Sequence, residues 1–107
     1  FLAAEGRGLL ATGVSWDQSG IAPMTVVCST IYYVPNLVVI VVKQFKEGTF
    51  HGGIYDKGMM EGVVDIAPYH SFEDQIPQDA KDKVDELKKQ LIEGSFSAPL
   101  IEKRTAE

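Results

Sequence analysis

The sequence predicts an α/β domain, and three features support this class. An apolar run at residues 9–14 stops at a cluster of small polar residues, as a buried parallel strand does where it ends at the edge of a sheet. Residues 1–8 are typical of the last turn of a helix, closed by Gly6 or Gly8, so a helix leads directly into that strand. Residues 77–93 follow an amphipathic helical pattern.

The distribution of charge predicts a half that is buried and a half that faces water. Residues 1–42 carry only Glu5, Arg7 and Asp17 as charged side chains, whereas the residues from Ser71 onward are rich in acids and bases. The chain also begins at Phe1, with neither a methionine nor a signal-like segment. We therefore expect residues 1–107 to form a single incomplete domain at the end of a longer protein.

Composition limits the classes of function. A net charge of −5 offers no basic stripe to neutralise phosphates, so nucleic acid is not expected as a partner. Cys28 is the only cysteine, which excludes an internal disulfide and a cysteine-based zinc site, and its apolar surroundings predict a buried, inert thiol. We expect no cofactor.

The polar cluster after the first strand is the strongest candidate for a binding site. Ser15, Asp17, Gln18 and Ser19 would present hydroxyl, carboxylate and amide groups where residues 9–14 end. In open α/β sheets, ligands bind just beyond the carboxyl ends of the strands. The alternative is an ordinary polar turn.

Residues 24–42 are uncharged, and their pattern alone leaves three interpretations open. Many Val, Ile, Thr and Tyr residues suit strands, with a division near Pro35 and Asn36. Apolar residues at intervals of three or four also fit one face of a helix that continues to Phe45. A membrane-spanning helix is the third interpretation, which the polar residues in and before the segment disfavour.

The second half contains simpler signals. Residues 50–58 predict a strand and a glycine-rich turn, and residues 62–69 predict a second strand. The helix over residues 77–93 is expected to have Pro77 at its first position and to end at Gly94. One apolar stripe should dock this helix: Ala80, Val84, Leu87 and Leu91. After Leu100 and Ile101, which are candidates for packing, residues 102–107 are expected to be a frayed tail.

No catalytic constellation is present in the sequence. His51 and His70 are far apart and neither lies in a metal-binding spacing. His70 follows a predicted strand, and a hydrogen-bonded residue in a turn is a simpler interpretation of it than a general base. No nucleophile elbow occurs. We therefore do not expect an enzyme.

Several motifs occur in one order along the chain. Gly-Val-x-x-Asp-Gln-Ser-x-Ile-Ala-Pro covers residues 13–23, Gly-Gly-x-Tyr covers residues 52–55, Val-x-Ile-Ala-Pro-Tyr covers residues 64–69, and Ile-Pro precedes the last helix. This series, from residue 9 to about residue 101, resembles the basic membrane protein (BMP) family. These proteins are substrate-binding lipoproteins of ABC importers and include purine nucleoside receptors.

The resemblance implies a type I periplasmic-binding-protein fold, in which two Rossmann-like lobes close over a ligand and this chain is the C-terminal portion. It also implies a helix between the Asp-Gln loop and the next strand, so residues 24–45 are expected to form a buried helix interrupted at Pro35. The implied ligand-binding residues are Ser15, Asp17, Gln18 and Tyr32. Ser15 stands where the family has an acid that receives ribose hydroxyls, and Tyr32 stands where the family has a lysine.

The resemblance further implies partners and a location. A nucleoside-like small molecule would be bound only with the other lobe, and the ABC importer's membrane subunits would receive it. The protein would lie outside the cytoplasm, anchored through an N-terminal lipid absent from this chain. The 107 residues alone are expected to self-associate through apolar seams. The alternative is a structural or regulatory interaction module that kept the fold and lost the ligand.

Overall fold

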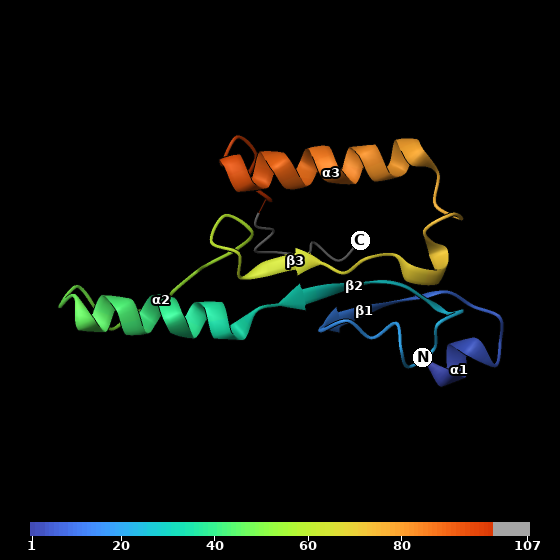
Figure 1. The fold of residues 1–107 in the computed structure, drawn as a ribbon, viewed down its shortest axis with the longest axis horizontal. Helices are drawn as coiled ribbons and strands as arrows, with labels where there is room; N and C mark the ends of the chain where they lie inside the picture. The colour runs from blue at the N-terminus through green and yellow to red at the C-terminus, as the bar shows by residue number, and fades with distance from the viewer. Residues whose placement is uncertain (100–107) are drawn as a thin grey trace, which may run out of the picture.

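The computed structural model describes residues 1–99, so the predictions for Leu100, Ile101 and the tail at 102–107 lie outside the described residues. Figure 1 shows the order of the elements. They are α1 (Leu2–Glu5), β1 (Ala11–Ser15), β2 (Val26–Tyr32), α2 (Val34–Lys46), β3 (Val64–Ile66), the short 3-10 helix η1 (His70–Phe72) and α3 (Gln78–Glu93).

The three strands form one mixed sheet in the order β1-β2-β3. β1 and β2 are parallel, with Gly13 opposite Ser29 and Ser15 opposite Ile31, whereas β3 runs antiparallel to β2. The predicted succession of a short helix and a strand at the N-terminus is confirmed. The expectation that this strand is buried is wrong, because Gly13 is the one buried residue of β1 and Val14 is 53% accessible. Gly8 has the left-handed φ of +64° that the end of such a helix requires.

The prediction of one interrupted helix over residues 24–45 is wrong. The segment is strand β2 followed, after Tyr33 alone, by helix α2. Pro35 lies in the first turn of α2, where a missing N–H removes no helical hydrogen bond and the fixed φ suits the helix. Pro35 therefore begins a helix instead of breaking one, and the β-branched residues before it pair as a strand.

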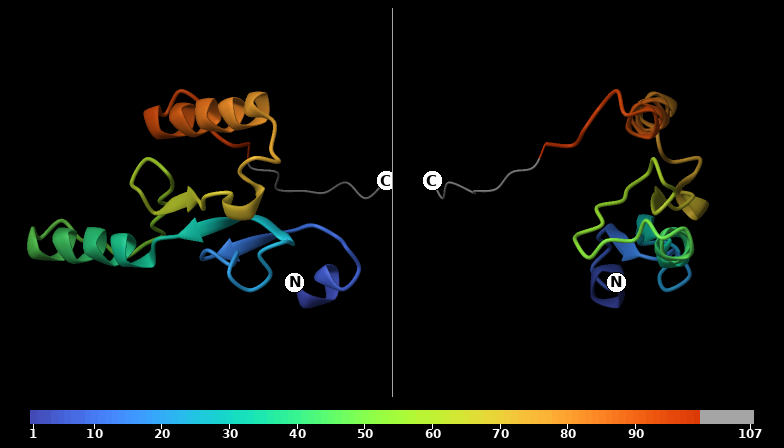
Figure 2. Two further views of the ribbon diagram at one scale, coloured as in Figure 1. Left: turned by 45° about the vertical axis from the view of Figure 1, so that its right-hand side comes forward. Right: turned by 90° about the vertical axis from the view of Figure 1, so that its left-hand side faces the viewer.

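The expectation that this helix is buried is also wrong. Figures 1 and 2 show α2 projecting beyond the end of the sheet, and no residue of α2 is buried. Its exposed apolar side chains, between 46% and 74% accessible, are Val34, Val38, Val39, Val42 and Phe45. An apolar surface of this kind is unusual on a soluble monomer and favours association.

We expect the 107 residues to self-associate through α2 at micromolar concentration. Replacing Val38 and Val42 by glutamate places two charges on the exposed apolar face and should give a species that sediments as a monomer. Lys83→Glu changes the net charge equally but lies on the exposed side of α3, so this control should still associate. A wild-type chain that sediments as a compact monomer would contradict the expectation.

The small core lies around the first half of β2. Its buried apolar side chains are Ala22, Val26, Val63, Ala67 and Phe72, and the buried polar ones are Thr25 and Ser29. These residues come from the β1–β2 loop, from β2 and from the segments on both sides of β3. The core therefore fixes the β1–β2 loop and η1 against the same part of β2.

The predicted strand within residues 50–58 does not form. Instead, the ring of Tyr55 stacks on Phe50 with centroids 5.8 Å apart, and the Tyr55 hydroxyl donates to the carbonyl of His51. Aromatic packing and a side-chain hydrogen bond therefore organise this segment without strand pairing. The strand predicted at residues 62–69 is confirmed, although only its centre pairs, as β3.

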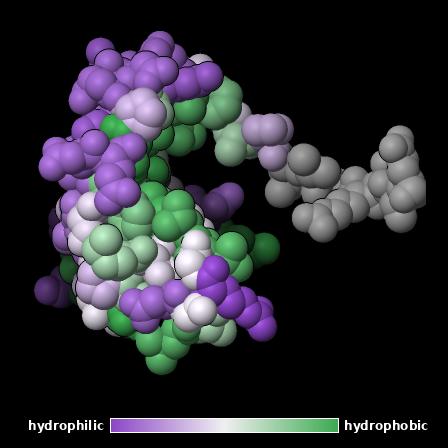
Figure 3. Space-filling view, turned by 90° about the vertical axis from the view of Figure 1, so that its right-hand side faces the viewer, coloured by the Kyte–Doolittle hydropathy of each residue, from purple (hydrophilic) through white to green (hydrophobic). Residues whose placement is uncertain are grey.

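Helix α3 is confirmed, with Pro77 as the residue that precedes its first turn and Gly94 in the left-handed conformation at its end. Two ion pairs tie it to the rest of the chain: Lys88 with Asp65 of β3, and Lys81 with Glu73, at 2.9 Å. Burial raises the pKa of Asp65, but the Lys88 ammonium and the Ile66 N–H together hold it below its usual value. Figure 3 shows hydrophilic residues gathered over α3 and hydrophobic ones lower on that face.

The apolar stripe of α3 docks only in part. Val84 and Leu91 are half-buried, whereas Ala80 is exposed and Leu87 is 39% accessible. We expect Leu87→Ala to lower the free energy of unfolding by about 1 kcal/mol, below the range of about 2–5 kcal/mol for a fully buried leucine. Denaturant unfolding of Leu87→Ala and of Leu91→Ala measures the two losses in the free energy of unfolding. A larger loss for Leu87→Ala than for Leu91→Ala would contradict the docking of α3 in this structure.

Candidate functional site

The carboxyl ends of β1 and β2 lie side by side because the two strands run parallel, and their register, shifted once between Ala11 and Gly13, is regular from Gly13 to Ser15. Ser15 ends β1 opposite Ile31, and Tyr32 ends β2, so both predicted residues stand at one edge of the sheet. Tyr32 is 46% accessible and Ser15 is exposed. Ser15 has a φ of +80°, a conformation that is uncommon without glycine and is enriched at functional sites.

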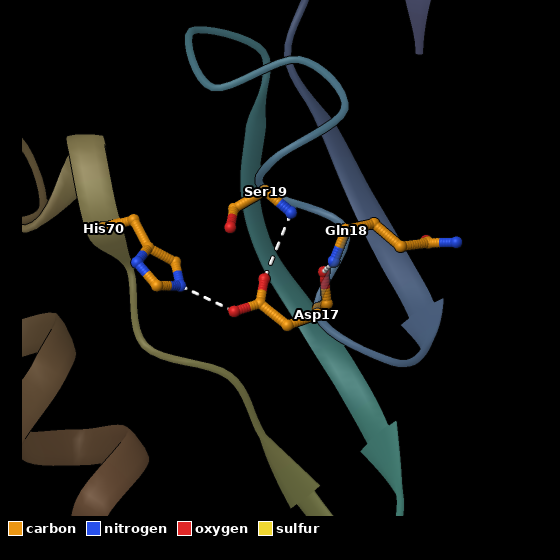
Figure 4. A network of polar contacts seen from close by, with 5 residues as sticks. Asp17, Gln18, Ser19 and His70 are labelled. Atoms are coloured by element: carbon orange, nitrogen blue, oxygen red, sulfur yellow. Dashed lines mark hydrogen bonds and ion pairs between the residues drawn. The ribbon is translucent and has the colours of Figure 1, made fainter.

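The loop that follows Ser15 is anchored by Gln18. The Gln18 side-chain carbonyl accepts the N–H of Val14 at 3.0 Å, and the Gln18 N–H donates to the hydroxyl of Ser29 at 3.1 Å. Ser29 is fully buried in β2. The amide group of Gln18 points away from Asp17 and His70 (Figure 4). One residue thus joins the end of β1 to the middle of β2.

Asp17 makes two hydrogen bonds within the protein. Its Oδ1 accepts the N–H of Ser19 at 3.1 Å, and its Oδ2 lies 2.7 Å from Nε2 of His70 (Figure 4). The Ser19 N–H, the Ser19 hydroxyl and then His70 lower the pKa of Asp17 from its usual 3.8, so the carboxylate is ionised at neutral pH. A carboxylate has about four acceptor positions, so further contacts remain possible.

The predicted binding residues therefore fall into two neighbouring groups. Ser15 and Tyr32 share the edge, and Asp17 and Gln18 belong to the loop that turns back beside β2. Their roles in binding stay predictions. The groups offer hydroxyl donors and acceptors, a carboxylate, an amide and an aromatic ring, a set suited to a neutral polar solute.

The sequence did not reveal two members of this network. His70 is hydrogen-bonded in a turn as predicted, but its partner is Asp17, which lies 53 positions away. Ser29 was unassigned, and the available signal was a small polar residue within an apolar strand. Neither pairing follows from local pattern, because each depends on how the loop and η1 fold against β2.

A cleft of about 350 Å³ lies elsewhere, between α3 and residues 66–69. Lys81 and Lys88 line it, and both are already paired with carboxylates, so it offers no free cation to a ligand. Within residues 1–99, no cluster of three or more metal-ligating side chains occurs. In the same described part, none of the helices has the length and apolar character that crossing a bilayer requires. Cys28 is half-buried and not buried as predicted, and this partial burial raises the pKa of its thiol, as expected of an unreactive cysteine.

An α/β sheet with polar groups at the carboxyl edge of its parallel strands is characteristic of a ligand-binding lobe. Residues 2–98 match the model of the Bmp family, described as ABC transporter substrate-binding protein PnrA-like. The chain belongs to this family, as the motif order indicated.

Among curated proteins, the chain is similar to the transcriptional activator protein med of Bacillus subtilis (strain 168), with 35% identity over 68 residues. That match covers 64% of this chain and 22% of the relative, so the chain spans about a fifth of its length.

Two solved structures are similar in fold. A transcriptional activator of the comK gene from Bacillus halodurans superposes with a TM-score of 0.74 at 25% identity, over 89% of this chain and 32% of that one. An ABC transporter solute-binding protein from Aeropyrum pernix K1 superposes with a TM-score of 0.69 at 22% identity, over 95% of this chain and 36% of that one. The second likeness confirms the predicted periplasmic-binding-protein-like fold.

Proposed function

We propose that the chain is the C-terminal part of a solute-binding protein of an ABC importer and that its solute is a purine nucleoside. The observation that carries the proposal is the parallel β1–β2 edge, which holds Ser15 and Tyr32 next to the loop of Asp17 and Gln18. Membership of a substrate-binding family supports the solute-binding part of the proposal.

Each residue has a role in this proposal. Ser15 exchanges hydrogen bonds with ribose hydroxyls without the help of a charge, which makes each bond weaker than one to an acid. Asp17 accepts a further hydrogen bond, and Gln18 donates through its projecting amide. Tyr32 offers a ring and a neutral hydroxyl in place of a cation. The aromatic residues that stack on the base belong to the other lobe.

The proposal extends to location and partners. The protein would be held outside the cytoplasm by an N-terminal lipid and would deliver its solute to the importer's membrane subunits. Membership of a family of ABC transporter substrate-binding proteins supports this extension at the level of the family.

A second candidate function is a regulatory interaction module without a solute. It is favoured by the 35% identity to one transcriptional activator and by the likeness in fold to another. The exposed apolar face of α2 would then contact a protein partner.

Equilibrium dialysis separates the two candidates. A protein that carries these residues together with a first lobe is offered inosine, guanosine, adenosine, ribose and free purine bases. We expect saturable binding of whole nucleosides and far weaker binding of ribose or base alone, because the two lobes contact different parts of the solute. Absence of binding to every nucleoside, with altered transcription when the gene is deleted, would favour the regulatory candidate.

A further inference from the structure

We infer that His70 is a positioning residue, which holds the β1–β2 loop in its binding conformation through Asp17. The inference rests on the proposed function for its effect on solute affinity. His70 is not expected to contact the solute itself. It acts from η1, which follows β3, on a loop near the start of the chain.

The first argument is the geometry of the pair. His70 Nε2 lies 2.7 Å from Asp17 Oδ2, and the two side chains are 42% and 34% accessible. Asp17 is held at its other oxygen by the N–H of Ser19. The carboxylate is therefore fixed from both sides, once by its own loop and once by η1.

The second argument is the conformation of His70. Its φ of +49° is in the left-handed region, which costs free energy for a residue other than glycine and persists where neighbouring structure imposes it. Phe72, two residues later, is 5% accessible and anchors η1 in the core. The imidazole is thus presented to Asp17 by a segment that is itself fixed.

The third argument is the division of anchors along the loop. Gln18 fixes the loop to β1 and β2 through Val14 and Ser29. From this loop, the carboxylate of Asp17 makes the hydrogen bond to His70. Loss of His70 would leave the Gln18 anchors in place and release Asp17, so the polar groups would have to be ordered again at each binding event.

The pair depends on the ionised carboxylate of Asp17. The pKa of Asp17 is lowered from its usual 3.8, so its carboxylate is ionised and holds the pair at every pH above that value. The pair is lost only in stronger acid, which protonates the carboxylate.

Nuclear magnetic resonance of the chain measures this coupling without any solute. We expect the N–H of Ser19, which donates to Asp17, to exchange with solvent several times faster in His70→Ala than in the wild type. His51→Ala replaces the other histidine and should leave this exchange rate unchanged. Signals from α3 report that each variant is folded.

Solute affinity is measured with a protein that has both lobes. His70→Ala should lower inosine affinity about three- to tenfold, and His70→Gln, which keeps a donor, should recover part of the loss. A Ser19 N–H that exchanges equally fast in the wild type and in His70→Ala would overturn the inference. Faster exchange in His70→Ala, with no nucleoside binding by the wild type, would support the positioning role and contradict the proposed function.

Discussion

Gly13→Ala is expected to lower the free energy of unfolding by about 2–4 kcal/mol, the largest loss we predict for a single methyl group. An added Cβ would lie 2.3 Å from the hydroxyl oxygen of Ser29 and 2.7 Å from the side-chain carbonyl of Gln18. These two atoms form the hydrogen bonds that anchor the β1–β2 loop. The methyl group therefore both crowds the sheet and displaces the anchors.

Denaturant unfolding provides the measurement, with Gly20→Ala as the matched control. An added Cβ at Gly20 has no atom within 4 Å, so this change in the same loop should have little effect. Ser29→Ala in the Gly13→Ala background removes the nearest clashing atom and should recover part of the loss. Equal losses for Gly13→Ala and Gly20→Ala would show that the close approach of β1 and β2 is absent in solution.

The second large effect concerns solute binding. We expect the 107 residues alone to bind neither inosine nor guanosine measurably, and a two-lobe protein to bind with micromolar or better affinity. A neutral hydrogen bond contributes about 0.5–1.5 kcal/mol and one to a charged group about 1.5–3 kcal/mol. Three or four such contacts on an open edge do not offset the cost of immobilising a ligand, estimated at about 4 kcal/mol or more.

Calorimetry on the 107 residues checks this expectation. The Val38→Glu, Val42→Glu variant provides a control for any effect of self-association, because its changes lie on the exposed apolar face of α2. Saturable micromolar binding that Asp17→Ala abolishes would mean that this edge is a complete site by itself.

The parts of the fold that were predictable are those set by local pattern. Strand β1 follows from an apolar run that ends at polar residues, and α3 follows from the amphipathic repeat that ends at Gly94. The change from β2 to α2 was harder, because uncharged β-branched residues fit a strand and a helix alike. Pro35 indicates a kink if a helix precedes it and the start of a helix if a strand precedes it, so its meaning depended on the structure of the residues before it.

The parts of the site that were not predictable depend on tertiary structure. Ser15 was expected at the end of a strand and lies there, whereas Tyr32 was expected within a helix and instead ends β2 at the same edge. The Asp17–His70 pair needs β3 to run antiparallel to β2, so that η1 returns to the loop. The exposed face of α2 was also missed, because an apolar pattern indicates that a face should be covered and not what covers it.

The most direct test of solute binding at the β1–β2 edge is calorimetry of inosine with Ser15→Asp in a two-lobe protein. Aspartate tolerates the left-handed φ of +80° found at this position, so the backbone should accept the change. A charged partner for the ribose hydroxyls should strengthen binding about tenfold, while Ser15→Ala should weaken it. Affinities that are identical in the wild type, Ser15→Asp and Ser15→Ala would show that the solute, if any, is bound elsewhere.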